Sequence, residues 1–488
     1  MKLFAIRGGI HPDYRKELCA EKAIVALPLP RKLTIPLQQH AGAPALPVVA
    51  VGDVVGKGQV LAKAQGMISA PVHAPTSGRI AEIGDFPAPH PSGLTQRSII
   101  LEPDGRDAWA DDLPAPIADP FKASARDIGD RVAASGIVGL GGAAFPSAVK
   151  LSLGTRHKLD MLLLNGAECE PYLTCDDRVM REYTDEVVDG ARIMAHALGA
   201  PRVVVAIEDN KPAALAAMVK AAGAFANVEV VSVPVQYPMG SERHLTQAII
   251  GLETPARKLT ADLGVVVHNV ATARAVHHAV RFGRPLVSRV VTVSGKGISQ
   301  PKNVDVPLGT AVSELLAFCG GLSGTPKRVI SGGPMMGQPL PSLDVPVVKG
   351  TSGILALTDA EVNEKPAGPC IRCGTCVTIC PCGLVPVEMA AFIRKENMDG
   401  AAKSGVMDCV SCGSCSYVCP SHIPLVHYFN YAKGMINAKD RERRKTEQTK
   451  AMVEVRAARL EKLAEAKHKA TAARKAPTET PGEGKASA

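Results

Sequence analysis

A run of four cysteines followed by proline occurs twice in this 488-residue chain, and it limits the fold of that region more than any other feature. Nine of the 13 cysteines fall within one short stretch. The first residues contain no apolar core of a secretory signal, so we expect a reducing, cytoplasmic setting in which crowded thiols indicate metal rather than disulfides. The two copies have the same spacing and are offset by 39 positions: Cys370, Cys373, Cys376, Cys380 and Pro381; Cys409, Cys412, Cys415, Cys419 and Pro420.

The spacing C-x2-C-x2-C-x3-C-P is that of bacterial ferredoxins with two [4Fe–4S] clusters, in which the fourth cysteine of each run binds the other cluster. We therefore expect one cluster on Cys370, Cys373, Cys376 and Cys419, and a second on Cys380, Cys409, Cys412 and Cys415. Two zinc sites are the alternative, but zinc favours separate CxxC pairs over CxxCxxC triplets. Cys382 fits no ligand position, and we interpret it as a packed free thiol.

The remaining sequence predicts several domains of mixed class, α/β together with α+β. Alternating short apolar runs broken by glycine and proline indicate a β domain, and alternating strand and helix patterns then indicate a layered α/β domain. The predicted divisions are a β domain at 1–120, an α/β domain at 121–285, a small module at 286–345, a linker at 346–368, the cysteine module at 369–432 and a tail at 433–488.

Charge is concentrated in that tail. The chain has a formal net charge of +9, and residues 433–475 carry 14 basic against 6 acidic side chains. The body is therefore nearly neutral, and aromatic residues make up only 3%, which argues against a folded nucleic-acid-binding domain. We expect a helix over 433–475 followed by disorder. The helix is interpreted as solvated, with contact to anionic lipid or an acidic partner as the alternative.

Four glycine-rich or polar loops lie at predicted element ends in the α/β domain. Gly136–Pro146 precedes a helix, and Asn165–Pro171 follows the buried strand 159–164. Two further segments, Tyr237–Arg243 and His268–Thr272, are of the same kind. Glycines let a backbone approach a phosphate or ring, and polar residues at the carboxyl ends of parallel strands often meet ligand. A flexible turn, a helix cap at Glu168 and a turn fixed by Asn165 are the structural alternatives.

These loops, with the Gly8–Pro12, His73–Gly78 and Ile330–Gly337 segments and the paired cysteine motifs, resemble the FMN- and NADH-binding subunits of respiratory complex I. They resemble the C component of Rnf electron transport complexes more closely, over residues 1 to about 435. The resemblance implies a carrier-like β barrel-sandwich domain, a Rossmann-like flavin/NADH domain, a soluble-ligand-binding β-grasp module and a two-cluster ferredoxin domain. The carrier-like tip, Gln65–Ser69, has no lysine, which indicates a docking or structural role.

The resemblance also implies residues that hold FMN and NAD(H). Two departures from the complex I pattern bear on the charge around the flavin, because Leu140 and Ala167 stand where that family has arginine and aspartate. Phe145 corresponds to an aromatic residue on the nicotinamide side. The expected cofactor-binding residues are Gly139, Gly141, Gly142, Phe145, Lys150, Asn165, Glu168, Glu242, Asn269 and Thr272.

The sequence thus predicts a peripheral subunit on the cytoplasmic side of the inner membrane. It would pass electrons between NADH, FMN, two [4Fe–4S] clusters and a ferredoxin-like partner in an ion-translocating complex. A non-enzymatic iron–sulfur relay that has lost flavin and NADH binding is one alternative. The NADH-oxidising subunit of a hydrogenase or formate dehydrogenase is another.

Overall fold

The computed structural model describes residues 2–362 and 364–475, which form two compact units. The first unit runs to Val387 and takes in Asp408–Val426, and the second comprises Glu388–Met407 and the chain from His427 onward. All 13 cysteines belong to the first unit. Within the described residues, no helix is long and apolar enough to cross a membrane.

The N-terminal β domain consists of two small sheets that enclose one core. A four-stranded antiparallel sheet has the order β2-β8-β7-β4, and a three-stranded sheet has the order β3-β5-β6. Leu33, Ile80 and Leu101 are fully buried between them, as the alternating pattern requires. The strands are β2 (Leu33–Pro36), β3 (Leu46–Pro47), β4 (Val54–Val55), β5 (Val60–Lys63), β6 (Val72–His73), β7 (Gly78–Pro87) and β8 (Thr95–Pro103).

The α/β domain is built on a parallel sheet with the order β11-β10-β9-β12. In chain order this is 3-2-1-4, the order of a doubly wound half-sheet, which reverses direction between its first and fourth strands. The strands are β9 (Met161–Gly166), β10 (Arg202–Glu208), β11 (Val228–Val233) and β12 (Val265–Asn269). The helices are α1 (Ala125–Ala134), α2 (Ser147–Leu151), α3 (Cys175–Glu182), α4 (Thr184–Leu198), α5 (Pro212–Ala222), α6 (Glu242–Ile250) and α7 (Val270–Phe282), with short 3-10 turns η2 (Ser152–Thr155) and η3 (Thr260–Leu263).

Both faces of this sheet are covered, so its strands are continuous apolar runs. Leu162 and Leu164 pack on the side of α1, α4, α5 and α7, whereas Met161 and Leu163 pack on the side of α6. Successive strand residues face opposite sides, so each strand contributes to both cores. The carboxyl edge of the sheet, where the loops emerge, is left for polar side chains.

A third sheet has the order β1-β14-β13-β17-β15-β16 and packs on α8 (Val312–Phe318). It differs from the predicted divisions in two ways. β1 (Ile24–Ala26) lies in the segment assigned to the N-terminal domain, and β17 (Gly353–Leu357), which is fully buried, lies in the segment interpreted as a linker. The prolines and glycines around β17 suggested a connector, but pairing with two neighbours decided its conformation. The other strands are β13 (Ser288–Ser294), β14 (Lys302–Pro307), β15 (Arg328–Ser331) and β16 (Gln338–Pro339).

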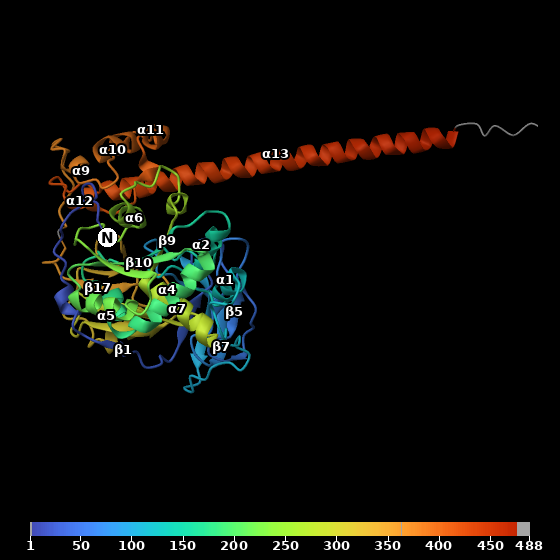
Figure 1. The fold of residues 1–488 in the computed structure, drawn as a ribbon. Coiled ribbons are helices and arrows are strands. Elements are labelled where there is room, and N and C mark those ends of the chain that lie inside the picture. The colour runs from blue at the N-terminus through green and yellow to red at the C-terminus, as the bar shows by residue number, and fades with distance from the viewer. Residues whose placement is uncertain (1, 363, 476–488) are drawn as a thin grey trace, which may run out of the picture. The chain divides into compact units, whose positions relative to one another are not determined.

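The cysteine module contains short helices, and a long helix follows it. That long helix, α13, begins eight residues before the predicted tail and runs unbroken to Lys475 (Figure 1). Every side chain from Arg441 to Ala472 is exposed, as expected for a mixed-charge helix. The predicted disorder of the last residues lies outside the described residues. The elements are η1 (Lys16–Leu18) near the amino end, then α9 (Thr375–Thr378), α10 (Pro386–Arg394), α11 (Met398–Lys403), η4 (Val406–Asp408), α12 (Ser414–Tyr417) and α13 (Leu425–Lys475).

Candidate functional site

The first candidate site lies where the parallel sheet reverses direction. β9 and β12 are neighbours, and Asn165 at the end of β9 pairs in register with Asn269 at the end of β12. The two asparagines, predicted from loops more than 100 residues apart, therefore lie side by side. In open parallel sheets this edge is where ligands bind.

Asn269 and Thr272 join the end of β12 to the start of α3 and to the segment 136–146 (the glycine loop). Its side-chain oxygen accepts hydrogen bonds from the Ala271 and Thr272 amides, at 2.9 and 3.3 Å, and so caps α7. Its Nδ2 donates to Asp176 at the start of α3, at 2.6 Å. The Thr272 hydroxyl accepts from the Leu140 amide of the glycine loop at 2.9 Å. The cap of α7, the segment 165–177 (the acidic loop) and the glycine loop are thus joined by hydrogen bonds.

Glu168 caps a helix, which was the structural alternative considered for it. Its carboxylate accepts from the Asp176 amide at 2.7 Å and from the Asp177 amide at 3.2 Å, at the start of α3. Its backbone φ of +48° turns the chain sharply after β9. Burial, with the Glu168 charge adding to it, raises the pKa of both aspartates, that of Asp177 to about 6. The loop therefore concentrates negative charge at the sheet edge.

Lys150 supplies the opposite charge. Its Nζ lies 2.6 Å from Glu242 Oε2 and donates to the Val267 carbonyl of β12 at 3.0 Å. Glu242 also accepts from the Thr260 hydroxyl at 2.9 Å. The Asn165 side chain donates to the Gly240 carbonyl at 2.8 Å, directly before α6. The turn that contains Gly240 and Glu242 is therefore joined to both β9 and α2.

The glycine loop borders an open space. Gly139 closes the loop by donating to the Phe145 carbonyl at 2.8 Å, and Phe145 is half-buried. Gly142 is exposed with a φ of +110°, and a Cβ placed on it would meet nothing within 4 Å, whereas one on Gly141 would lie 3.4 Å from Asn269. Ser147 Oγ is buried without a hydrogen-bond partner among the described residues. Free space, backbone amides and an unpaired hydroxyl fit a phosphorylated, ring-containing cofactor.

Two supporting lysines were missed at the sequence level. The Lys16 ammonium donates to the carbonyls of Glu168 and Glu170, at 2.8 and 3.1 Å, and also to that of Leu173. Lys211 donates to the Ala167 carbonyl at 2.7 Å and pairs with Glu208 at 2.6 Å. Both hold the backbone of the acidic loop. Neither belongs to a motif, and only the fold brings them to it.

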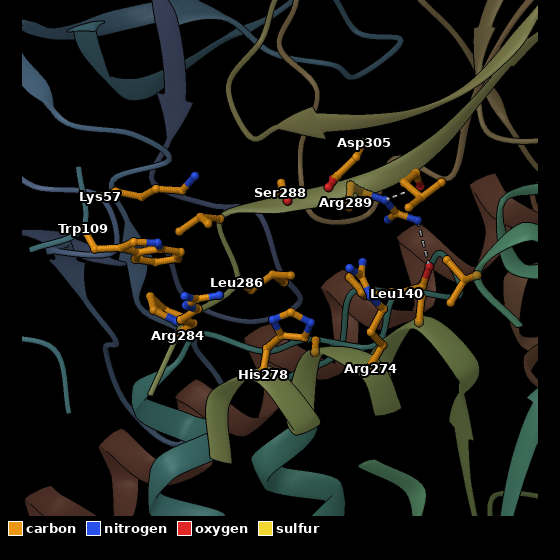
Figure 2. A pocket seen from close by; sticks show the side chains of 16 residues that line it. Lys57, Trp109, Leu140, Arg274, His278, Arg284, Leu286, Ser288, Arg289 and Asp305 are labelled. Carbon is orange, nitrogen blue, oxygen red and sulfur yellow. Dashed lines mark hydrogen bonds between the residues drawn. The ribbon is translucent and has the colours of Figure 1, made fainter. Parts of the chain in front are cut away.

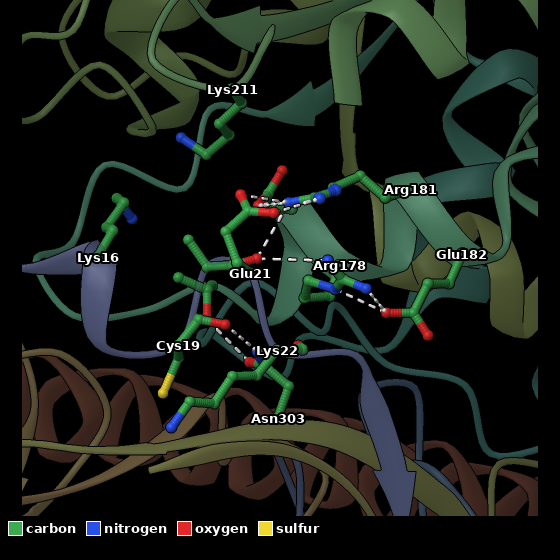
Figure 3. Close-up of polar contacts among 12 residues, drawn as sticks. Lys16, Cys19, Glu21, Lys22, Arg178, Arg181, Glu182, Lys211 and Asn303 are labelled. Atoms are coloured by element: carbon green, nitrogen blue, oxygen red, sulfur yellow. Dashed lines mark hydrogen bonds and ion pairs between the residues drawn. The ribbon is translucent and has the colours of Figure 1, made fainter. Parts of the chain in front are cut away.

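The segment around Lys16 is held by α3 of the α/β domain and by β14 of the third sheet. The carbonyl of Ala20 accepts from Arg178 and Arg181 of α3, at 3.3 and 3.0 Å. Asn303 of β14 donates to the Cys19 carbonyl at 3.1 Å, and Figure 3 shows these contacts together. The residues before β1 therefore belong structurally to the α/β domain and the third sheet.

The two cysteine runs have the same local geometry. Gly374 and Gly413, which precede α9 and α12, have φ values of 78° and 79°. The Arg372 amide donates to Cys370 Sγ at 3.4 Å, and the equivalent Ser411 amide donates to Cys409 Sγ at 3.3 Å. Amides aimed at sulfur stabilise negative charge on a thiolate. The sequence repeat is therefore also a structural repeat.

Thiols from both runs surround Cys376 and Cys415. Burial raises the pKa of Cys376, and the thiols of Cys373, Cys419 and Cys370 raise it further because like charges repel. Burial likewise raises the pKa of Cys415, and the added contributions come from Cys412, Cys409 and Cys380. Among the described residues, no three His, Cys, Asp or Glu side chains converge tightly enough for a single metal ion.

Cys382 lies beside the second run of cysteines. Burial raises the pKa of Cys382 to about 12, and the thiols of Cys380, Cys409 and Cys412 contribute to the increase; its sulfur lies 3.9 Å from His244 Nε2. The thiols of Cys19, Cys169, Cys175 and Cys319 are free and buried. That Cys382 is a packed thiol and not a ligand stays a prediction.

One buried contact joins the α/β domain to the second thiol set. The Tyr237 side chain is fully buried, and its hydroxyl donates to the Cys412 carbonyl at 2.7 Å. Glu170 accepts from the Met335 and Met336 amides at 3.0 and 2.9 Å, and burial raises its pKa to about 7. The set that contains Cys412 is therefore packed against the loops of the candidate flavin site, whereas Cys370 and Cys373 are exposed.

Four family descriptions match the chain, in the order of its domains. They are the RnfC barrel sandwich hybrid domain at residues 4–106, the Nuo51 FMN-binding domain at 132–278, the SLBB domain at 290–339 and the 4Fe-4S dicluster domain at 369–423.

Curated relatives match over most of the chain. The C component of the ion-translocating oxidoreductase complex of Rhodobacter capsulatus is 56% identical over 91% of this chain and 85% of its own length. The C component of the proton-translocating ferredoxin:NAD(+) oxidoreductase complex of Clostridium ljungdahlii is 45% identical over 88% of this chain and 94% of its own length. Among solved structures, an NAD+-reducing [NiFe]-hydrogenase in the H2-reduced state is 21% identical with a TM-score of 0.45, covering 64% of this chain and 63% of that chain.

Proposed function

The chain belongs to the RnfC family, the C components of ion-translocating oxidoreductase complexes, and from that premise we propose that it is the subunit that exchanges electrons with NADH. The observation that carries the proposal is the convergence of four distant loops on the switch point of the parallel sheet, in the same compact unit as both cysteine sets. The matches to FMN-binding and 4Fe-4S dicluster descriptions support FMN, NAD(H) and two [4Fe–4S] clusters as its cofactors.

In this proposal the flavin phosphate lies at Gly141 and Gly142 of the glycine loop, where the backbone can approach an anion closely. The dipole of α7 favours the negative charge, although Asn269 caps the first amides of that helix. Lys150, kept in place by Glu242, adds positive charge, and Asn165 and Asn269 fix the orientation of bound groups. Glu168 acts chiefly by holding α3 and the acidic loop. The proposed contact set is Gly139, Gly141, Gly142, Phe145, Lys150, Asn165, Glu168, Glu242, Asn269 and Thr272.

Bound FMN would supply the chemistry that links a hydride donor such as NADH to iron–sulfur clusters, which accept one electron at a time. Cys380, Cys409, Cys412 and Cys415 form the ligand set beside the flavin loops, where apolar packing around Cys412 keeps water out. Cys370, Cys373, Cys376 and Cys419 form the other set. Because Cys370 and Cys373 are exposed and Ile371 is 67% exposed, this other set is where a ferredoxin-like partner can approach.

We also propose where this subunit lies in the cell and how its chain is divided into domains. We infer a peripheral subunit on the cytoplasmic side of the membrane, held there by the other subunits of the complex. We place domain limits at residues 120, 285, 368 and 432, with β17 counted in the third sheet and β1 as a strand that the amino-terminal segment adds to that sheet. Each range matched by a family description lies inside one of these segments, which supports the division.

An anaerobic absorbance spectrum of the purified protein, before and after NADH is added, tests the proposal. We expect flavin bands above a broad iron–sulfur shoulder, and we expect NADH to bleach the flavin bands. A shoulder that NADH leaves unchanged while dithionite bleaches it would identify an iron–sulfur relay without flavin chemistry, and the proposal would be wrong.

A further inference from the structure

A cavity lies where three domains of the first unit meet, beside the amino end of α7. It has a volume of about 180 Å³. Lys57 and Trp109 of the N-terminal domain line one side, α7 lines another, and Ser288 and Asp305 of the third sheet close it (Figure 2). Nothing in the proposed flavin chemistry uses these side chains.

Cationic side chains dominate the polar lining of this cavity. Glu186 of α4 holds both Arg274 and His278, at 2.7 and 2.9 Å, so that they face the cavity from α7 (Figure 2). Lys57 and the Arg284 guanidinium each lie 5.0 Å from the Trp109 ring centroid. These contacts set the positions of the cations before a ligand arrives, which lowers the entropic cost of binding.

Arg284 is the cation of this cavity without a carboxylate partner among the described residues. Four cationic side chains line the cavity: Lys57, Arg274, Arg284 and Arg289. Asp107 pairs with Lys57, Glu186 pairs with Arg274, and the charge of Asp176 acts on Arg289. Asp305 also lies in the lining, so cations and carboxylates are equal in number. Within the described residues, no carboxylate pairs with Arg284, and an anionic group is therefore favoured locally, at Arg284.

Asp305 adds a second requirement. Its Oδ1 atom is buried and has no hydrogen-bond partner among the described residues, and Figure 2 shows its carboxylate directed into the cavity. A buried acceptor without a donor is costly, and a bare anion placed beside it would be repelled. A ligand suited to this cavity therefore carries an anionic group at the arginine side and a hydrogen-bond donor at the Asp305 side.

We propose that this cavity binds a compact hydroxylated phosphate monoester. The guanidinium forks of Arg274 and Arg284 match the geometry of a phosphate, which offers three terminal oxygens where a carboxylate offers two. A carbon-borne hydroxyl then donates to Asp305. The cavity borders the proposed FMN site, because Leu140 of the glycine loop and Ala271 at the amino end of α7 line its wall.

Titration calorimetry with glycerol 3-phosphate tests this assignment. The FMN-loaded, full-length protein is used, so that the proposed flavin phosphate site is already filled. Arg274→Gln removes a lining cation, and Arg281→Gln is the matched control, because Arg281 lies on the same helix and pairs with Asp189 of α4 but does not line the cavity. We expect Arg274→Gln to weaken binding about tenfold or more, and Arg281→Gln to leave it within about twofold. No binding to the parent protein, or equal losses in both variants, would overturn the proposal.

A second comparison tests the role of Asp305 and the ligand class. The parent protein should bind glycerol 3-phosphate more tightly than inorganic phosphate, which has no carbon-borne hydroxyl, and Asp305→Asn should remove most of that preference. Malate tests whether a hydroxylated carboxylate serves equally well. Equal binding of glycerol 3-phosphate and inorganic phosphate by the parent protein, or malate binding as tight as that of the phosphate ester, would refute the assignment.

Discussion

At the residue scale, most of the candidate flavin site is made by side chains that also complete local structure. Asn269 caps α7, Glu168 caps α3, and Asn165 fixes the turn before α6. The structural and functional roles of such residues are therefore compatible. A substitution at one of them should affect both stability and flavin content, and a matched cap elsewhere separates the two effects.

Asn269→Ala should lower both stability and flavin content. It removes the cap of α7 and the 2.6 Å bond to Asp176, and caps of this kind contribute about 1 kcal/mol. Ser124→Ala removes the cap at the end of α1 that is opposite to the glycine loop, at a similar cost. Melting temperature and flavin released per chain are the measurements. If both variants lose flavin equally, Asn269 has no specific role in holding it.

Glu170 should make stability fall as the pH rises. Burial raises its pKa from 4.5 to about 7, so between these values the folded protein holds a proton that the unfolded chain has released. The free energy of unfolding then decreases by about 1.4 kcal/mol per pH unit between these two pKa values. The stabilisation that the protonated Glu170 provides is complete only below the lower value. Glu170→Gln should flatten this decrease.

Melting temperatures measured between about pH 5 and pH 7.5 test the effect of Glu170. Glu361→Gln is the control, because the net effect of its surroundings, burial opposed by hydrogen bonds, lowers the Glu361 pKa and leaves that carboxyl ionised throughout the range. The difference between parent and Glu170→Gln should depend on pH, and that for Glu361→Gln should not. If the melting temperatures of the parent protein and Glu170→Gln change in parallel with pH, the Glu170 carboxyl of the parent protein ionises with an ordinary pKa.

At the element scale, the cysteine module behaves as a duplicated loop–helix unit. Its two copies share left-handed glycines, amide-to-sulfur contacts and one-turn helices. The fourth cysteine of each run lies with the other run, because Cys419 perturbs Cys376 and Cys380 perturbs Cys415. On the proposed ligand assignment, each cluster needs cysteines from both copies.

Cys373→Ala should therefore remove about half of the iron and leave the flavin in place. Cys382→Ala is the matched control, since Cys382 lies in the same module but outside both sets. Iron and flavin content per chain, with EPR of the reduced protein, measure the outcome. Loss of iron from Cys382→Ala to the same extent would show that the ligand assignment is wrong.

At the scale of the whole molecule, the amino-terminal segment and the α/β domain meet the cysteine module. Gly9 donates to the Ile379 carbonyl at 2.9 Å, and a Cβ on Gly8 would lie 2.5 Å from that oxygen, so a larger residue does not fit there. Tyr237 makes the corresponding contact to the second run, through Cys412. This chain, an electron-transfer subunit of an ion-translocating oxidoreductase, therefore holds its cofactor-binding modules together by buried contacts.

Tyr237→Phe should change the properties of one cluster only. The hydroxyl that donates to the Cys412 carbonyl is lost, and without that dipole the reduced state of the cluster on the Cys412 set is less well stabilised. We expect its midpoint potential to fall by an amount on the order of tens of millivolts, with the other cluster unchanged. Tyr172→Phe, which removes a hydroxyl bonded to Glu361, is the control. EPR-monitored redox titration decides, and equal shifts of both clusters would contradict the expected selectivity.

The sequence by itself determined the elements whose signals are local. Strands such as β10 and helices such as α5 follow from apolar periodicity and from proline and glycine at their ends, and the paired cysteine runs follow from their spacing alone. These patterns record interactions between residues close in the chain, so they can be read without the fold.

Only the tertiary structure decided which distant groups meet. Lys16 and Lys211 hold the acidic loop, β1 and β17 complete a sheet far from their sequence neighbours, and Arg274, Arg284 and Asp305 enclose one cavity. Each of these contacts joins segments that could, by their own sequence pattern, pair with several other segments. Strand pairing, the neutralisation of buried charges and the packing between domains decide which pair forms. These interactions join residues that are distant in the chain, so no periodic sequence pattern reveals them.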